Sequence, residues 1–286
     1  MQNKELKPML QKEMFWQTDD GIRIFAATWQ PEDAPKSVIS LIHGFGEHCL
    51  RYTPYISYFV EQGFAFVSFD LRGHGSTEGK QGVIQSYHHL LDDVDLCIQK
   101  TKELFPGIPH FIYGHSMGGN LVLNYLLRRK TNLSGAIITS PWLGLTHEPN
   151  IILRTLVRLL SPVFPNITID SGLDINQISS VKEEVEKYRT DPKVHGRISF
   201  RLFDAISKSG KWALANVELL TIPVLLMHGE ADQITSPKLS GKAAKRNPQL
   251  IEFKSWPNKY HELHNEDIRS EVAKTVIDWL NHKLNP

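Results

Sequence analysis

Short apolar runs alternate along the chain with longer stretches in which apolar residues recur every three or four positions. The first pattern is typical of buried strands and the second of amphipathic helices, so their alternation predicts strand–helix–strand units. The expected strands cover residues 22–29, 38–42, 64–69, 110–113, 133–139, 223–227 and 250–253, and the expected helices cover residues 55–62, 87–104, 117–129 and 267–280. The pattern therefore predicts an α/β fold with a mostly parallel central sheet flanked by helices.

The alternation is interrupted between about residues 142 and 215, where no clear sheet strand is found. Residues 151–160 predict an apolar helix that Pro162 and Pro165 are expected to end, and residues 179–189 predict a charged helix. The segments on either side of this stretch each look incomplete alone. We therefore expect a single domain over residues 1–286 with a helical cap inserted at about 142–215, in preference to two domains in series.

The expected cap helix carries more apolar side chains over residues 151–163 than an exposed helix needs. Two roles for them stay open. They either cover a tunnel that takes an acyl chain, since ligand pockets favour apolar junctions, or seal the cap onto the sheet domain. Apolar side chains left partly exposed would also let the cap make transient contact with a membrane or micelle surface.

The charge of the 286-residue chain is almost balanced, with 32 Lys and Arg against 31 Asp and Glu, which argues against a nucleic-acid partner. Its two cysteines, Cys49 and Cys97, are too few for a disulfide framework. The first residues lack the apolar core of a signal peptide, and no run approaches the roughly 18 apolar residues that span a bilayer. We expect a cytoplasmic protein whose membrane contact, if any, is peripheral.

One short run carries candidate nucleophile chemistry: Gly114-His115-Ser116-Met117-Gly118. A G-x-S-x-G run between a strand and a helix is typical of the turn that presents a nucleophilic serine, because glycines on both sides remove Cβ atoms that would collide there. The helix that follows points its positive end at the reaction centre. The alternative is a glycine-rich turn whose Ser116 has no role, and the predicted strand and helix on either side favour the catalytic interpretation.

A serine hydroxyl needs a base to take its proton and an acid to orient that base. In the α/β-hydrolase fold these follow the serine in the order acid, then histidine, each after a late strand. Asp232 is the expected acid, with Glu230 as its competitor, because Asp232 directly precedes the turn into the next helix. His261 is the expected base, with His264 as its competitor.

Two backbone amides should stabilise the negatively charged oxygen of the tetrahedral intermediate. We expect them at Met117, just after the nucleophile, and at Phe45, in the loop after an earlier strand. A zinc site at His261 and His264 is disfavoured, because these histidines are three residues apart and the zinc-protease helix needs four. We expect neither a metal nor a cofactor.

Five motifs occur in a fixed order: His43-Gly-Phe-Gly-Glu-His48, Asp70-Leu-Arg-Gly-His-Gly-Ser76, Gly114-His-Ser-Met-Gly-Gly119, His228-Gly-Glu-Ala-Asp232 and Tyr260-His-Glu-Leu-His264. Together they resemble the monoacylglycerol lipase and lysophospholipase-like family over nearly the whole chain. The resemblance carries the oxyanion donors over to Phe45 and Met117. It also implies a glycerol site at Glu47, Arg51 and His264, and a looser match adds Glu184 and Tyr188 in the cap. A plain surface ion pair between Glu47 and Arg51 is the alternative.

The residues and the resemblance together predict a serine carboxylic ester hydrolase that cleaves monoacylglycerol through an acyl-enzyme, with a small lipid-like ester as its partner. A broad-specificity esterase, a lysophospholipase and a thioesterase remain alternatives. A receptor that binds the same ligand without turnover also remains, since fold alone does not exclude it. Dehalogenases and epoxide hydrolases of this fold place an aspartate at the elbow, so Ser116 argues against both.

Overall fold

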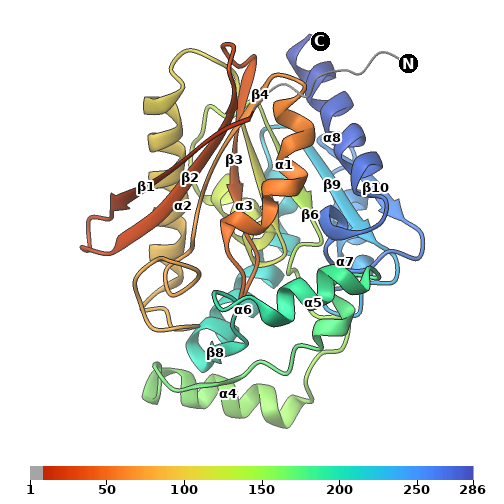
Figure 1. Cartoon of the computed structure of the whole chain (residues 1–286). Coiled ribbons are helices and arrows are strands. Elements are labelled where there is room, and N and C mark those ends of the chain that lie inside the picture. The colour runs from red at the N-terminus through yellow and green to blue at the C-terminus, as the bar shows by residue number, and fades with distance from the viewer. Residues whose placement is uncertain (1–8, 286) are drawn as a thin grey trace.

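The computed structural model describes residues 9–285, with the side chains of all of these except Leu153 and Arg154. It contains an eight-stranded sheet in the order β1-β2-β4-β3-β5-β6-β9-β10 (Figure 1). Strand β2 is antiparallel to β1 and β4, and the remaining neighbours are parallel. The strands are β1 (Met9–Gln17), β2 (Arg23–Pro31), β3 (Ser37–Ile42), β4 (Phe64–Phe69), β5 (His110–His115), β6 (Gly135–Thr139), β9 (Val224–Gly229) and β10 (Ile251–Trp256). The predicted α/β fold with a mostly parallel sheet is confirmed.

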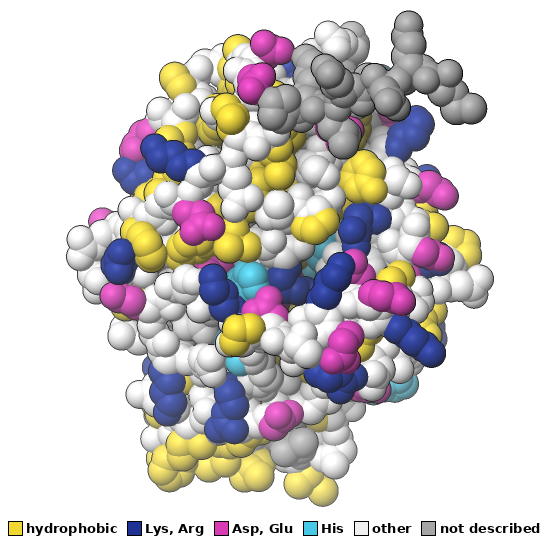
Figure 2. Space-filling model, viewed as in Figure 1, with side chains coloured by type: hydrophobic (Ala, Val, Ile, Leu, Met, Phe, Trp, Pro, Cys, Tyr) yellow, Lys and Arg dark blue, Asp and Glu magenta, His cyan; other side chains and the backbone are white. Residues whose placement is uncertain are grey.

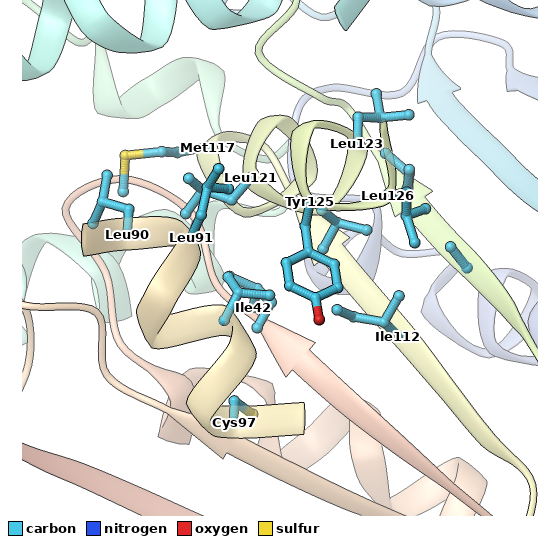
Figure 3. Close-up of a cluster of buried hydrophobic side chains, with 14 of the residues drawn as sticks. Ile42, Leu90, Leu91, Cys97, Ile112, Met117, Leu121, Leu123, Tyr125 and Leu126 are labelled. Atoms are coloured by element: carbon cyan, nitrogen blue, oxygen red, sulfur yellow. The ribbon is translucent and has the colours of Figure 1, made fainter. Parts of the chain in front are cut away.

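Helices cover both faces of the sheet, and the alternation of side chains along the strands explains why. In β4, Phe64 and Phe66 pack on the side of α1 (Thr53–Val60) and α8 (Arg269–Leu284), whereas Ala65 and Val67 pack on the opposite side. That side is covered by α2 (Tyr87–Leu104), α3 (Met117–Arg128) and α7 (Pro237–Arg246). Figure 3 shows side chains of α2 and α3 meeting over Ile42 of β3. A strand buried on both faces needs apolar residues at every position, which is the pattern of short apolar runs in the sequence.

The chain between β6 and β9, here called the β6–β9 segment, contains most of the remaining secondary structure. Its elements are α4 (Ile151–Val163), β7 (Thr168–Asp170), η2 (Ile175–Gln177), α5 (Lys182–Thr190), β8 (Arg197–Ser199), α6 (Phe200–Asn216) and η3 (Val217–Leu219). The two-stranded sheet formed by β7 and β8 was not predicted, because strands of three residues are too short for a readable alternation. Helix α4 runs to Val163, three residues beyond its expected end, so Pro165 follows the helix but Pro162 does not end it. Pro162 lies inside the last turn of this helix.

Loops at the ends of the strands hold the β6–β9 segment in place. The amide of His195 donates to the carbonyl of Gly46 at 2.9 Å, and the amide of Ser199 donates to that of Gly82 at 2.9 Å. A Cβ on Gly46, whose φ is +76°, would lie 2.4 Å from the His195 carbonyl oxygen, so this contact requires glycine. The β6–β9 segment is therefore docked against the loop that carries Phe45.

Helix α4 lies at the outer edge of the β6–β9 segment (Figure 1). Its apolar side chains are mostly exposed, by 49% to 77% of their surface: Ile151, Ile152, Leu156, Leu159 and Val163. They form a hydrophobic band at the lower end of the molecule in Figure 2. Among the helices of residues 9–285, none combines the length and apolar composition needed to cross a membrane. Residues 1–8, to which the expectation about a signal peptide refers, lie outside the described part.

Candidate active site

Ser116 lies at the sharp turn between β5 and α3, with φ +53° and ψ −114°. A side chain in this sparsely populated region is held there by its surroundings. The Ser116 amide donates to the Thr139 carbonyl at 2.9 Å, and the Ser116 carbonyl accepts from the amide of Asn120 at 3.0 Å. A Cβ on Gly118 would lie 2.1 Å from the Ile42 carbonyl oxygen, and one on Gly114 would lie 2.6 Å from that of Gly118. The two glycines of the motif therefore allow helix α3 to approach the sheet this closely.

Three side chains far apart in sequence form a hydrogen-bonded chain. The Nε2 atom of His261 lies 2.9 Å from Ser116 Oγ, and its Nδ1 atom lies 2.7 Å from Asp232 Oδ2. The competing residues lie elsewhere. Glu230 accepts from the exposed Ser255 hydroxyl at 2.6 Å, and His264 makes no contact with Asp232 among the described hydrogen bonds. The geometry therefore unites the three residues that the motif order selected.

The electrostatics of this chain suit a base that acts near neutral pH. Burial alone lowers the pKa of His261, but the adjacent Asp232 carboxylate outweighs burial and raises the pKa above its ordinary value of 6.5. Burial alone raises the pKa of Asp232, but the contacts with His261 and His228 outweigh burial and lower it. Asp232 therefore stays ionised while His261 gains and loses a proton.

Asp232 has further partners that the sequence analysis did not identify. Its Oδ1 atom accepts from the amides of Ile234 at 2.7 Å and Thr235 at 3.0 Å. Its Oδ2 atom also lies 2.9 Å from His228 Nε2 and 3.0 Å from the Thr235 hydroxyl. The sequence did contain a hint of the contact between His228 and Asp232, because both residues belong to the motif His228-Gly-Glu-Ala-Asp232.

The loop after β3 brings Phe45 and Glu47 to the same place. Phe45 lines the cavity together with Ser116, and among residues 9–285 no hydrogen bond within the protein uses the amide of Phe45 or Met117. Glu47 holds this loop, because its Oε1 atom accepts from the Gly44 amide at 2.6 Å and from the Tyr52 hydroxyl at 2.7 Å. Two unused amides next to a candidate nucleophile are what an oxyanion hole requires.

Arg51 lies between two buried carboxylates. It donates to Glu47 Oε2 at 2.5 Å and to both oxygens of Glu262, at 2.9 Å and 2.7 Å. Burial raises the pKa of Glu262 by itself, but the charge and hydrogen bonds of Arg51 outweigh burial and lower it to about 2. Burial raises the pKa of Glu47, and Arg51 offsets this only in part. The surface ion pair considered from the sequence is instead a buried triad, because the Arg51, Glu47 and Glu262 side chains are only 8%, 2% and 4% exposed.

Of the other residues expected at the glycerol site, Tyr188 lines the cavity and His264 is buried behind it. The Tyr188 side chain lines the cavity with Glu47 and Glu262, and its ring lies 4.6 Å from the Arg51 guanidinium. His264 is fully buried and stacks on Tyr52 with 4.3 Å between ring centroids. Burial lowers the pKa of His264 to about 3, so this imidazole is neutral.

Glu184 lies outside the cavity. Its carboxylate accepts from Arg269 at 2.7 Å and from Lys187 at 3.0 Å. The structure therefore brings together Glu47, Tyr188 and the nucleophile, with Arg51 directly behind Glu47, but does not bring Glu184 or His264 to the cavity wall.

One trio of side chains has the ligand types of a metal site. Single ligand atoms of Glu47, Glu262 and His264 lie within 4.8 Å of one another. However, the Arg51 guanidinium already bonds to both of these carboxylates. Because a second cation there would face this fixed positive charge, the donor set suits an internal ion network rather than a metal.

The cavity above Ser116 has a volume of about 530 Å³. Eight large apolar side chains line it: Phe45, Trp142, Leu145, Leu173, Ile178, Ile198, Phe203 and Ile234. No described side chain of α4 is among the lining residues, so the described part of this helix does not cover the cavity. Among the described apolar side chains of α4, Val157 is buried and Leu160 is partly buried, and the helix packs against α6.

The sequence matches the family described as "Serine aminopeptidase, S33" over residues 33–268. The chain belongs to this family. This S33 chain is 35% identical over 277 residues to an abhydrolase domain-containing protein of Dictyostelium discoideum, a match that covers 93% of this chain but only 28% of that protein. It is 30% identical over 274 residues to the monoglyceride lipase of Rattus norvegicus, covering 93% of this chain and 89% of the rat protein.

A solved structure gives the same result for the fold of this S33 chain. A soluble variant of monoglyceride lipase from Saccharomyces cerevisiae, in complex with a substrate analog, superposes with a TM-score of 0.87 and 26% identity. The superposition covers 98% of each chain. The resemblance drawn from the five sequence motifs is thereby confirmed.

Proposed function

We propose that this chain is a serine hydrolase that cleaves monoacylglycerol to a fatty acid and glycerol. The observation that carries the proposal is the hydrogen-bonded chain from Asp232 through His261 to Ser116, at the wall of a largely apolar cavity. An apolar cavity accepts an acyl chain, and the polar groups beside the serine accept a small alcohol. The similarity to monoglyceride lipases over most of the chain supports the same substrate.

The proposed mechanism follows from the roles of these residues. His261 takes the proton of Ser116 as its oxygen attacks the ester carbonyl, and Asp232 stabilises the imidazolium that forms. The amides of Phe45 and Met117 donate to the negatively charged oxygen. His261 then protonates the leaving glycerol oxygen, and water releases the fatty acid by the same sequence of steps. None of these steps needs a metal or cofactor.

The main test is the Ser116→Ala variant. We expect it to lose more than about a thousandfold of the kcat/KM of the wild type, and to lose labelling by a fluorophosphonate probe. Its melting temperature should stay near that of the wild type, because the change removes one hydroxyl. Wild-type protein that neither turns over monoacylglycerol nor reacts with the probe would favour the receptor alternative.

We place the glycerol hydroxyls against Glu47 and Tyr188, two of the polar side chains that line the cavity. Arg51 acts through Glu47, and we assign no substrate contact to His264 or Glu184. We expect Tyr188→Phe to raise KM for monoacylglycerol severalfold and to leave KM for a nitrophenyl ester unchanged. Equal effects on both substrates would remove the glycerol site.

The family description raises the alternative of an aminopeptidase. Such an enzyme must bind a substrate ammonium with unpaired carboxylates. Three carboxylates line the cavity. Glu47 and Glu262 are bonded to the Arg51 guanidinium, and Asp174 accepts from the amide and the side chain of Asn176 at 3.0 Å and 2.8 Å. The site therefore favours a neutral alcohol over an ammonium group. Turnover of monoacylglycerol, lysophosphatidylcholine, acyl-CoA and an amino-acyl anilide at equal concentration separates the lipase from the lysophospholipase, thioesterase and peptidase alternatives.

The exposed apolar band of α4 supports transient contact with a lipid surface, where the substrate resides. Because its described side chains do not line the cavity, the double variant Leu156→Ser/Leu159→Ser tests this contact separately from catalysis. We expect weaker binding to phosphatidylcholine vesicles and unchanged kcat/KM for a water-soluble nitrophenyl ester. Leu104→Ser, on the exposed side of α2, is the matched control. Unchanged vesicle binding by the double variant would contradict the proposal.

A further inference from the structure

The carboxylate of Asp232 is shared by two imidazoles. Its Oδ2 atom lies 2.7 Å from Nδ1 of His261 and 2.9 Å from Nε2 of His228. The side chains of Asp232 and His228 are both 0% exposed. His261 faces the substrate cavity, whereas His228 comes from the end of β9 and is not among the residues that line it. A second imidazole therefore binds the catalytic carboxylate from the side that substrate does not reach.

The surroundings of His228 determine where its proton lies. Nε2 faces Asp232 Oδ2 and also the carbonyl oxygen of Thr235 at 3.2 Å, and neither of these atoms has a hydrogen to donate. Nε2 must therefore be the protonated nitrogen. Nδ1 lies 2.8 Å from the hydroxyl oxygen of Ser240 on α7, which can donate to it. The Thr235 hydroxyl lies farther from Nε2, at 3.4 Å. With the proton on Nε2, each of these neighbours has a hydrogen-bonding role.

We propose that His228 is a positioning residue for the ester hydrolysis: as a neutral donor to Oδ2 of Asp232, it fixes the carboxylate in line with Nδ1 of His261 and limits how strongly that carboxylate attracts the imidazolium. The proposal rests on the proposed function and deepens it. The two backbone amides on Oδ1 hold one oxygen only. On the oxygen that His261 uses, His228 lies 2.9 Å away and the Thr235 hydroxyl lies 3.0 Å away. His228 therefore adds a directional donor there, beside the weaker contact with Thr235.

Loss of this donor has two consequences that differ from a general loss of packing. The carboxylate gains freedom to rotate, which weakens the orientation of His261 and lowers kcat. The charge on Oδ2 is also less compensated, so the protonated form of His261 is stabilised further. The acid limb of the pH profile should then move to higher pH, because a larger fraction of His261 is protonated and unable to act as a base at any given pH.

Other titratable groups face His261 and stay in place when only His228 is changed. Glu47 and Glu262 favour its charged form. The imidazole of His115 lies 4.8 Å away between ring centroids, and burial lowers the pKa of both His115 and His264, so both rings are neutral near pH 7. Since these groups act equally in every variant of His228, a displaced acid limb reports on the contact with Asp232.

The test compares two amides of different length. His228→Gln places its side-chain N–H near the position of the original Nε2, whereas His228→Asn places it near the original Nδ1, out of reach of Asp232. We measure kcat/KM for a nitrophenyl ester against pH for the wild type and both variants, with melting temperatures. We expect His228→Asn to lose about tenfold to a hundredfold at the optimum, with its acid limb at higher pH, and His228→Gln to recover the wild-type limb and most of the rate.

Equal pH profiles for the two variants, whatever their rates, would overturn the positioning role and leave His228 as a packing residue. Both variants keep a polar side chain beside Ser240, so each retains a partner in the fold. Failure of the proposed function has a separate signature. In that case the wild-type protein itself would show no ester turnover and no fluorophosphonate labelling, before any variant of His228 is compared.

Discussion

The buried carboxylates of Glu47 and Glu262 are both stabilised by one cation, Arg51. Removal of Arg51 should therefore lower the free energy of unfolding by several kcal/mol. The substitution Arg51→Met keeps much of the side-chain volume and deletes the guanidinium. The Arg51, Glu47 and Glu262 side chains are only 8%, 2% and 4% exposed, so water does not replace the lost partner. Breaking a buried ion pair in this way costs about 3–5 kcal/mol of unfolding free energy. The loss includes the contact of Arg51 with the Tyr188 ring.

The change of stability with pH tests the same prediction independently. In the wild type the pKa of Glu262 is lowered to about 2, so the stability that it contributes is present above the unfolded value near 4.5 and is lost as pH falls towards 2. In Arg51→Met the cation is gone and burial favours the protonated acids, so stability should instead rise as pH falls from neutral. The difference between the two proteins should therefore be largest near pH 7 and should shrink at lower pH.

Urea unfolding at pH 7 and pH 5 measures both effects. The matched control is the double variant Arg51→Met/Glu262→Gln. It removes one of the two buried carboxylates that are left without a cation, so it should regain part of the lost stability. A loss below about 1 kcal/mol at pH 7, the scale of an exposed ion pair, would refute the description of a buried triad. Equal losses of unfolding free energy at pH 7 and pH 5 would also refute the description of a buried triad.

Two further predictions concern the catalytic base and the loop that carries Phe45. Because Asp232 raises the pKa of His261, kcat/KM for a nitrophenyl ester should fall towards acid with a midpoint above 6.5, and a lower midpoint would contradict the assignment of the base. Gly46→Ala should melt at a lower temperature than Gly172→Ala. Both glycines have positive φ, but the added Cβ lies 2.4 Å from the His195 oxygen only in the first, and Gly172 has nothing within 4 Å. We expect the free energies of unfolding of the two variants to differ by about 1–3 kcal/mol. Equal melting temperatures would show that the contact between Gly46 and His195 is loose.

The sequence predicted those parts of the fold that depend on local periodicity. Residues 87–104 were assigned as a helix with the same ends as α2, because eighteen residues with one apolar face give a long signal. Helix α6 was missed, although Ser199 caps it by accepting from the Leu202 amide at 3.1 Å. It packs against α3, so its apolar positions reflect a partner that lies about eighty residues away. The strands β7 and β8 form only because they pair with each other.

The candidate site was predictable where its geometry is encoded in short motifs. The spacing around Ser116 and the order of acid and base identified the three residues that the structure brings together. The bonds of Arg51 to Glu262 were not predictable, because these residues are 211 positions apart and no local pattern links them. The surroundings of Glu184 were not predictable either, because a loose match in sequence cannot show that Arg269 donates to its carboxylate.

Under the proposed function, helix α4 and the cavity perform two separate tasks. Its exposed apolar side chains belong to the outer rim of the β6–β9 segment, whereas the residues that surround Ser116 come from other elements. If α4 makes the proposed contact, substitutions that adapt it to a different lipid surface can therefore accumulate there without altering the reaction. The reverse also holds, so acyl-chain selectivity can be redesigned from inside the cavity while the outer rim of the molecule is left untouched.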